Sequence, residues 1–381
     1  MTSLPSRRSF LAAGAGAALG LGTLGVTATA ATAAAAPADS SRGSGREETR
    51  TLDELYRDAV AESGKLVIYA GGDLADSGSG AGARTAFRQR FPEIDLQLIV
   101  DYSKYHDARV DNQLATDTLV PDVVQLQTVQ DFTRWKREGR LLRYKPAGFG
   151  KLYNKFRDPD GAWIAGMVIA FSYVYDVAAA GANPPRTPLD LVDPRWKGLV
   201  ASSYPHDDDA VLYLYSLYTE TYGWDWIARL AAQQPQFARG SFSPSTAINN
   251  KSAVVGIGTG GSPTSTGPIR MGMPDGHPFM AWGQRIAILK QAANPTAAKL
   301  YLNWQLSTER QTSNSWSVRT DIAPPTGLKP IWEYPNANVD GFPRFMEDRA
   351  KVEQLKQTYA LYFGEVKGDP TPGWPGLHPG A

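Results

Sequence analysis

The sequence predicts an α/β fold built on a parallel β-sheet that helices cover on both faces. Apolar runs over residues 65–69, 96–100 and 122–126 have the length and composition of buried strands. Helical patterns separate these runs, and the connections between them are short. In such a sheet the ligand lies beyond the carboxyl ends of the strands, which here are residues 70–73, 101–103 and 125–128.

The helices of this first part follow from amphipathic spacing and from capping residues. Thr51 is the expected cap of the first helix, because the acidic residues Asp53 and Glu54 follow in its first turn. A polar Gly/Ser loop over 77–82 is expected before the second helix. The four helices are expected over 52–63, 83–90 and 108–116, and from 129 through Trp135.

A second α/β unit follows a long β-prone stretch over 163–175, which is too long and unbroken for one ordinary strand. It is either a bent strand or hairpin, or a strand that runs from one domain into another. The remaining elements are strands over 198–201, 253–257 and 280–289, and helices over 210–222, 224–233 and 343–363.

Composition excludes several classes of protein. The 381 residues carry 39 Lys and Arg against 38 Asp and Glu, and a net charge of +1 argues against a nucleic-acid binder. The chain has no cysteine, which removes thiolate metal sites, disulfides, cysteine nucleophiles and lipid attachment to cysteine. No stretch after the N-terminal region reaches the length of a transmembrane helix.

The N-terminus has the layout of an export signal. Ser6, Arg7, Arg8, Phe10 and Leu11 resemble the twin-arginine pattern, and a weakly apolar segment and a small-residue run follow. We expect residues 1–36 to be removed and the protein to be periplasmic or extracellular, without an anchor through cysteine. Residues 37–64 are then a flexible leader and a short helix, and the Pro/Gly-rich residues 368–381 are a surface tail.

From about residue 65 to about residue 325 the chain resembles a known family. The segment Asn294-Pro-Thr-Ala-Ala-Lys-Leu-Tyr-Leu-Asn-Trp, with Arg319-Thr-Asp after it, resembles the late motif of bacterial solute-binding proteins of ABC transporters, in the branch that includes ferric-ion-binding proteins. Other landmarks occur in the order of that family, at 66–69, 91–94, 121–124, 139–142, 158–161 and 196–199.

The resemblance implies a type 2 periplasmic-binding-protein fold, in which two lobes close on a ligand and two strands cross between them. The crossings are expected near 164–169 and 273–280. Lobe 1 is expected to comprise 65–166 and 280–322, and lobe 2 to comprise 167–279 and 323–367. The implied partners are a small-molecule or ion ligand and a membrane permease. We also expect the receptor to be a monomer and to need no cofactor.

Ferric-binding relatives hold iron through a neighbouring pair of tyrosines after the strand that corresponds to 253–257. Here that place holds Gly258-Thr-Gly-Gly261, and no two tyrosines are adjacent anywhere in the chain. Glycine and threonine there offer backbone N–H groups and a hydroxyl, which suit oxyanions, although such a segment is also a simple tight turn. A small polar or anionic solute, or a metal ion, is therefore the expected ligand, and a ferric receptor without the tyrosine pair is an alternative.

The candidate ligand-binding residues lie at the expected strand ends. They are Gly72, Asp73, Ser103, Gln127, Thr128, Ser203, Tyr204, His206, Thr259 and Gly260. His206 and Asp207 are also candidate metal ligands, but Asp207 to Asp209 equally suit the start of the following helix as caps. No hydrolase, metalloprotease or phosphate-loop motif is present, so we expect no enzyme; a secreted enzyme that uses carboxylates is the alternative.

Overall fold

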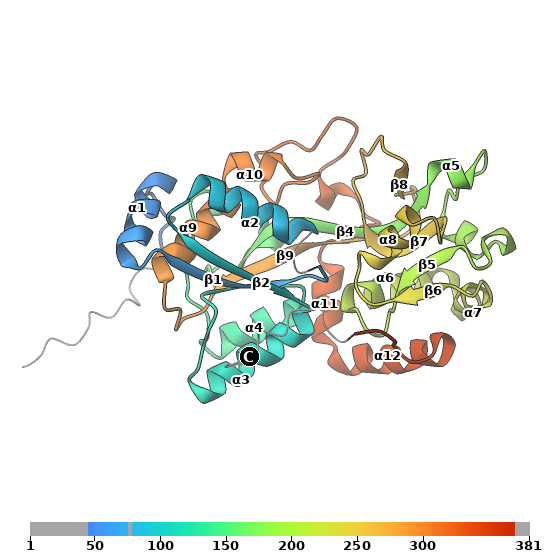
Figure 1. Ribbon diagram of the computed structural model, residues 1–381, viewed down its shortest axis with the longest axis horizontal. Helices are drawn as coiled ribbons and strands as arrows, with labels where there is room; N and C mark the ends of the chain where they lie inside the picture. The colour runs from blue at the N-terminus through green and yellow to red at the C-terminus, as the bar shows by residue number, and fades with distance from the viewer. Residues whose placement is uncertain (1–44, 75–77, 370–381) are drawn as a thin grey trace, which may run out of the picture. The chain divides into compact units, whose positions relative to one another are not determined.

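The computed structural model describes residues 45–74 and 78–369. The predicted signal, most of the predicted leader and the end of the tail lie outside the described residues. Within the described residues, nine strands form one mixed sheet in the order β2-β1-β3-β9-β4-β7-β5-β6, and β8 pairs with β4. Figure 1 shows this sheet with helices packed along it.

The first three strands confirm the predicted parallel unit. β1 (Lys65–Gly71) lies between β2 (Asp95–Asp101) and β3 (Val123–Leu126), and both pairs are parallel. The short connections therefore bring the three carboxyl ends to one edge, as the alternation of strands and helices indicated.

The helices of this unit are α1 (Leu52–Glu62), α2 (Gly78–Arg90), α3 (Ser103–Thr116), α4 (Val129–Arg137) and, from later in the chain, α9 (Pro295–Gln305). Thr51 caps α1 in a capping box with Glu54, as expected. The loop predicted over 77–82 is wrong from residue 78 onward, and α3 begins five residues before its predicted start. Glycine and serine disfavour a helix locally, but burial of Ala83 and Phe87 in the core outweighs this propensity in α2.

Two long strands connect the two ends of the sheet. β4 (Ile164–Asp176) pairs antiparallel with β9 (Met280–Ile288) from Ile164 to Phe171, then continues along β7, while β9 also pairs with β3. The second crossing was predicted over 273–280, but the strand begins only at Met280. Pro274, Gly276 and Pro278 explain the difference, because proline cannot donate to a central ladder.

The far part of the sheet contains β5 (Val200–Ser203), β6 (Gln236–Ala238) and β7 (Val255–Gly260), with β8 (Ile269–Gly272) beside β4. Its helices are α5 (Val177–Ala180), α6 (Asp209–Tyr222), α7 (Trp224–Ala232), α8 (Ser243–Asn249), α11 (Gly341–Glu347) and α12 (Arg349–Phe363). Short segments complete the fold: α10 (Thr308–Thr312) and 3-10 turns at Phe149–Lys151, Asn154–Phe156, Pro188–Val192, Pro194–Trp196 and Ile331–Glu333.

Two large hydrophobic cores define the two lobes. The first lobe, which carries β1 to β3, buries Phe87, Phe91 and Tyr301. The second lobe, which carries β5 to β7, buries Tyr215 and Tyr359, so the predicted packing of the C-terminal helices on this lobe is confirmed. The first core also takes in Leu55 of α1 and residues from Ile331 to Val339. The division of the chain between lobes that the sequence suggested remains a prediction.

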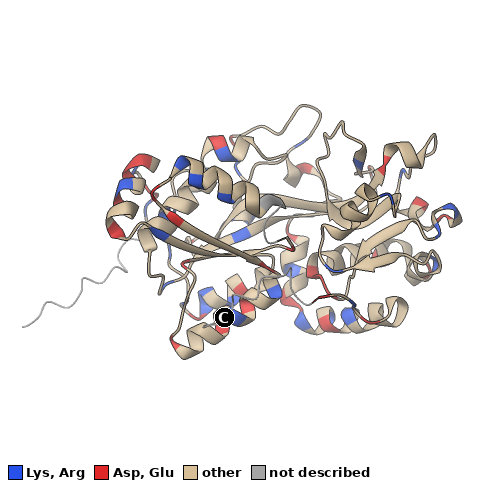
Figure 2. Ribbon diagram, viewed as in Figure 1, with Lys and Arg blue, Asp and Glu red and all other residues tan. Residues whose placement is uncertain are grey.

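Residues before α1 are held against the first lobe, although the composition predicted an unpacked leader there. Glu48 accepts a hydrogen bond from the Tyr144 hydroxyl at 2.9 Å and pairs with Arg50 at 2.6 Å. Within the described part of the chain, no helix has the length and apolar character needed to cross a membrane. Charged residues lie mostly on helices and loops, and β4 to β7 carry only Asp176, at the end of β4 (Figure 2).

Candidate functional site

A cleft of about 440 Å³ lies where the carboxyl ends of β1 and β3 meet the second lobe. Its walls come from both lobes, and its floor is the middle of β4, from Met167 to Phe171, together with Trp282 and Gln284 of β9. This volume is in the range of sites that hold small organic molecules. The two crossing strands thus form the base of the cleft.

The first-lobe wall contains five of the predicted residues: Gly72, Asp73, Ser103, Gln127 and Thr128. Ser103 begins α3, and its Oγ accepts a hydrogen bond from the Gln127 backbone N–H at 2.9 Å. This bond ties the ends of two strands together. The parallel topology therefore gathers these residues as the sequence indicated.

Thr259 and Gly260 also line the cleft, from the second lobe. The strand predicted to end at residue 257 continues to Gly260, and Thr259 and Gly260 pair with Ser172 and Phe171 of β4. The segment is therefore part of the sheet ladder rather than a free loop of N–H donors. The Thr259 hydroxyl is buried and lies 3.2 Å from the Ser245 hydroxyl.

Three predicted residues do not line the cleft: Ser203, Tyr204 and His206. The Ser203 hydroxyl is buried and donates to the Gly240 carbonyl at 2.9 Å. The Tyr204 ring stacks on Phe237, and His206 Nε2 lies 2.8 Å from the Gly364 carbonyl. Their place after a strand suggested a role at the cleft, but the chain turns their side chains into the second lobe.

The acidic run 207–209 does line the cleft, and its capping interpretation is confirmed at one position. Asp208 is the N-cap of α6, and its Oδ1 accepts hydrogen bonds from the Ala210 and Val211 backbone N–H groups at 2.9 and 3.1 Å. Asp209 pairs with Lys356 at 2.9 Å. Among the described residues, no three or more His, Cys, Asp or Glu side chains are grouped so that they could hold a metal ion.

Sequence reasoning missed the loop Gly240-Ser241-Phe242, which lines the cleft before α8. It follows β6, a strand of only three residues whose pattern is too short to recognise. It also missed Lys104 and the segment 314–316. Lys104 directly follows the strand end at 101–103, so extending that segment by one residue would have found it.

The loop Gly240-Ser241-Phe242 contacts the carboxylate of Asp73. Asp73 Oδ2 accepts a hydrogen bond from the Phe242 backbone N–H at 2.8 Å. Gly240 has a φ of +84°, and a Cβ at this position would collide with the Asp73 carboxylate. Burial, with a further contribution from the nearby Asp208 carboxylate, raises the pKa of Asp73 to about 6, despite the hydrogen bond from Phe242.

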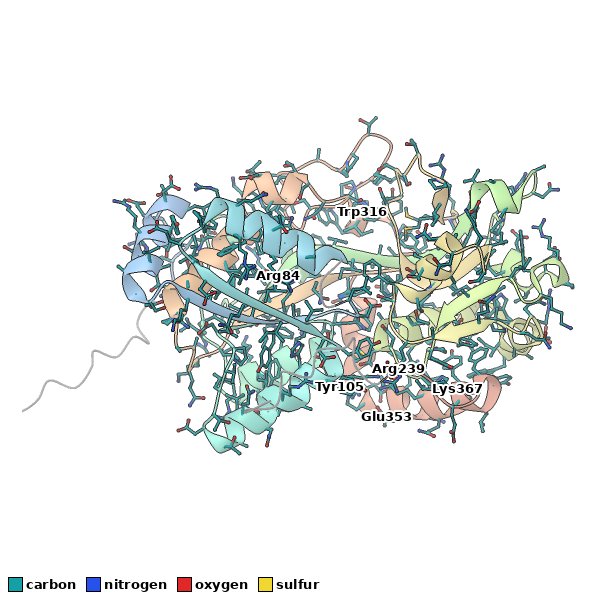
Figure 3. All side chains as sticks on the ribbon, viewed as in Figure 1. Arg84, Tyr105, Arg239, Trp316, Glu353 and Lys367 are labelled. Atoms are coloured by element: carbon teal, nitrogen blue, oxygen red, sulfur yellow. The ribbon has the colours of Figure 1, made fainter. Side chains whose placement is uncertain are left out.

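Polar contacts between described residues join the lobes across the cleft. Besides the Asp73 contact, Lys104 Nζ binds the Asp207 carboxylate at 2.5 Å, and Gln127 Nε2 donates to Asp208 Oδ1 at 2.9 Å. A further contact joins Arg239 Nη1 to the Tyr105 hydroxyl at 3.1 Å, two residues that Figure 3 labels side by side. The structure is therefore that of a closed arrangement of the two lobes.

Several aromatic rings contribute to the cleft wall. Trp282 and Phe171 are buried and meet edge to face at 5.2 Å, and Trp316 donates its indole N–H to the Lys329 carbonyl at 3.1 Å. Phe242, by contrast, is 39% exposed, and Tyr102 is partly buried at the start of α3. The first three rings are fixed by packing, which leaves Phe242 and Tyr102 as the accessible aromatic faces.

Part of the chain matches a known protein family. Residues 119–258 match the family of bacterial extracellular solute-binding proteins. No curated protein matches the sequence. The matched segment contains Gln127, Thr128 and the acidic run before α6, so it includes parts of both walls of the cleft.

Solved structures share the fold at low sequence identity. Iron-bound HitA from Pseudomonas aeruginosa is 16% identical, with a TM-score of 0.60 over 77% of this chain and 99% of that one. The periplasmic binding protein AfuA from Actinobacillus pleuropneumoniae, with fructose 6-phosphate bound, is 18% identical, with a TM-score of 0.62 over 78% and 98%. Trichodesmium FutA, in complex with iron and citrate, is 16% identical, with a TM-score of 0.52 over 77% and 99%.

These similarities agree with the two lobes, the crossing strands and the cleft between them. Residues 119–258 therefore match a bacterial extracellular solute-binding domain, and the chain has the two-lobe fold of the type 2 periplasmic binding proteins.

Proposed function

We propose that this protein is the solute-binding component of an ABC importer, which captures a small solute by lobe closure and delivers it to a membrane permease. One observation carries the proposal: a cleft of about 440 Å³ is lined from both lobes, and polar contacts join the lobes across it. A ligand that touches both walls stabilises the closed arrangement over an open one, which is the physical basis of capture by closure.

The match to extracellular solute-binding proteins and the likeness to HitA, AfuA and FutA support this proposal. Those proteins carry iron or a sugar phosphate, so the fold itself does not fix the ligand. We propose export by the twin-arginine-type signal, action as a monomer outside the cytoplasm, and handover to a permease without chemistry on the solute.

A ferric receptor is a weaker candidate. Tyr102 is the one tyrosine among the described residues that line the cleft, and Tyr204 is packed on Phe237 instead. A carboxylate enzyme has one observation in its favour, the raised pKa of Asp73 in the cleft, since a carboxyl group with a pKa near 6 is suited to proton transfer.

Two measurements test the proposed function. Isothermal titration of the exported protein against a solute panel should give one-to-one binding, with the solute recovered unchanged. Small-angle scattering should show a smaller radius of gyration with the solute than without it. Steady formation of product would support an enzyme instead. In the producing bacterium, deletion of the gene should abolish uptake of the bound solute; unchanged uptake would contradict the role in import.

A further inference from the structure

Acidic side chains outnumber basic ones on the cleft wall. Among the described residues that line it, Asp73, Asp207, Asp208 and Asp209 are acidic and Lys104 is the single basic one. Lys104 is bound to Asp207, and Asp209 pairs with Lys356. No ion pair joins Asp73 or Asp208 to a residue that the structure describes, although the charge of Lys104 also acts on Asp208.

Asp73 and Asp208 face the cleft from opposite lobes. Asp73 follows β1, whereas Asp208 caps α6. The hydrogen bonds that described residues donate to Asp208 all reach Oδ1, which leaves Oδ2 for a ligand. The two carboxylates are close enough to repel each other, since the charge of Asp208 contributes to the raised pKa of Asp73. A positive charge between them would relieve this repulsion in the closed state.

A second, independent feature points to a ligand with hydrogen-bonding groups. Thr128 lines the cleft and is only 2% exposed, yet its hydroxyl has no hydrogen-bond partner among the described residues. Buried hydroxyl groups in proteins are nearly always satisfied. This one can accept a hydrogen bond from an ammonium N–H or donate to a polar atom of the ligand.

The accessible rings and the size of the cleft favour an organic cation over a bare ion. Phe242 and Tyr102 offer aromatic faces beside Asp73, and the Lys104 ammonium already lies 5.7 Å from the Tyr102 ring centroid. A volume of about 440 Å³ is that of an organic ligand. A metal ion would lack a set of three acidic or imidazole ligands among the described residues.

The same charges disfavour an anion. A phosphate or carboxylate in the cleft would lie against Asp73 and Asp208, and Lys104 would have to leave Asp207 to compensate it. The sequence suggested a polar or anionic solute. The charges of the cleft walls disfavour the anionic class.

We propose that the ligand is a small organic cation whose positively charged nitrogen lies between Asp73 and Asp208, next to Thr128, with its carbon chain against Phe242 and Tyr102. This inference rests on the proposed solute-binding function and specifies the ligand class. A primary ammonium and a quaternary ammonium share the required charge, but only the primary ammonium can donate to Thr128.

The test is isothermal titration of the purified exported protein with spermidine, choline, fructose 6-phosphate and citrate. We expect one of the two cations to bind one-to-one and both anions to show no binding. Asp73→Asn should weaken binding of that cation at least about tenfold, because the charge is lost and the shape is kept. Asp208→Asn should act likewise, since asparagine still caps α6.

The control is Asp348→Asn, the same chemical change at the N-cap of α12, outside the cleft lining. It should leave the affinity unchanged. If spermidine binds and choline does not, a ligand with N–H donors is supported, and Thr128→Val should then weaken binding. If choline binds, a quaternary or similarly charged nitrogen is supported, and Thr128→Val should have no effect.

Two results would overturn the cationic class. One is binding of fructose 6-phosphate or citrate with neither cation bound, in which case the receptor function stands and only the charge assignment fails. The other is absence of binding of both cations at about 1 mM, a concentration that reveals even weak sites. Conversion of a bound cation to product would contradict the receptor function while leaving the cationic site intact.

Discussion

Lys104 at the start of α3 and Asp207 before α6 form a salt bridge of 2.5 Å that connects the two lobes across the cleft. The Lys104 ammonium also reaches the Asp207 backbone carbonyl at 2.7 Å. The bridge is possible only when the lobes are closed, so it favours the closed arrangement even before a solute is bound. Because Lys104 keeps 31% of its side-chain exposure, we assign the bridge only about 1 kcal/mol.

Lys104→Met should therefore shift the unliganded protein toward an open arrangement. Loss of about 1 kcal/mol changes the closed-to-open ratio roughly fivefold, and small-angle scattering should show a larger radius of gyration. Lys351→Met is the matched control, because Lys351 pairs with Glu220 within the second lobe at 3.1 Å. An identical radius for Lys104→Met and the wild type would show that the bridge does not hold the lobes.

Asp73→Asn should change the pH dependence of stability. The pKa of Asp73 is raised from the ordinary value of 3.8 to about 6, chiefly by burial, so the folded state holds this proton more tightly than the unfolded state. Stability from this group is present below pH 3.8 and is lost as the pH rises through 6, by roughly 3 kcal/mol in total. Denaturant unfolding should show the variant more stable than the wild type at pH 7.5 and nearly equal at pH 4. Equal stability at both values would contradict the raised pKa.

The affinity for an organic cation should rise with pH between about 5 and 7, because the ionised form of Asp73 binds the positive charge. Titration in buffers of different ionisation enthalpy should detect release of a proton on binding near pH 6. Among the described residues, the charged and titratable groups around Asp73 are Tyr102 and Lys104 of the first lobe and Asp207, Asp208 and Arg239 of the second. Burial raises the pKa of Tyr102 and of Asp208, so Asp208 adds to the same trend. Affinity that falls over this range would indicate an anionic ligand.

Thr128→Val should leave folding intact. The Thr128 hydroxyl has no partner among the described residues, so its replacement by a methyl group of similar size removes no hydrogen bond of the folded chain. The melting temperature should be unchanged or slightly higher, whereas affinity for a ligand with N–H donors should fall about three- to tenfold. A clear drop in melting temperature would show that the hydroxyl has a structural partner.

Glu48→Gln should weaken the attachment of the segment before α1. The hydrogen bond from Arg50 is the largest cause that lowers the pKa of Glu48 to about 2 from its ordinary value of 4.5. The contribution of Glu48 to stability is therefore complete above pH 4.5 and is lost as the pH falls toward 2. Because the Arg50 side chain is 38% exposed, screening by solvent reduces the contribution of Glu48 to about 1–2 kcal/mol. Unfolding at pH 7 should show this loss, and the difference between variant and wild type should vanish near pH 2. A constant difference at all pH values would point to packing instead.

Export through the twin-arginine route should depend on Arg7 and Arg8. Replacing both by lysine keeps the charge but removes the paired arginines of the signal. The processed protein should then disappear from the extracytoplasmic fraction in immunoblots while the precursor accumulates in cells. Unchanged processing would indicate another export route.

Local patterns were sufficient for most of the fold. The strand ends at Asp73, Ser103 and Gln127 could be predicted as neighbours, because alternating strands and helices allow essentially one hand and one parallel arrangement. The start of α2 could not be predicted, because Gly78 and Ser79 disfavour a helix locally. Only burial of Phe87 in the core compensates for this low helix propensity. The loop around Phe242 could not be predicted either, because β6, the strand before it, has only three residues and is too short to show an alternating pattern.

The sequence by itself determined the α/β class, the parallel first sheet and the absence of cysteine chemistry, since each depends on residue identity or on spacing along the chain. The export signal that it indicates remains a prediction. Only the tertiary structure decided which polar groups share the cleft. It turned Ser203, Tyr204 and His206 into the second lobe, and it brought Asp73 opposite Asp208. The physical reason is that charge complementarity depends on distance in space, and residues 135 positions apart in sequence become neighbours only when the lobes close.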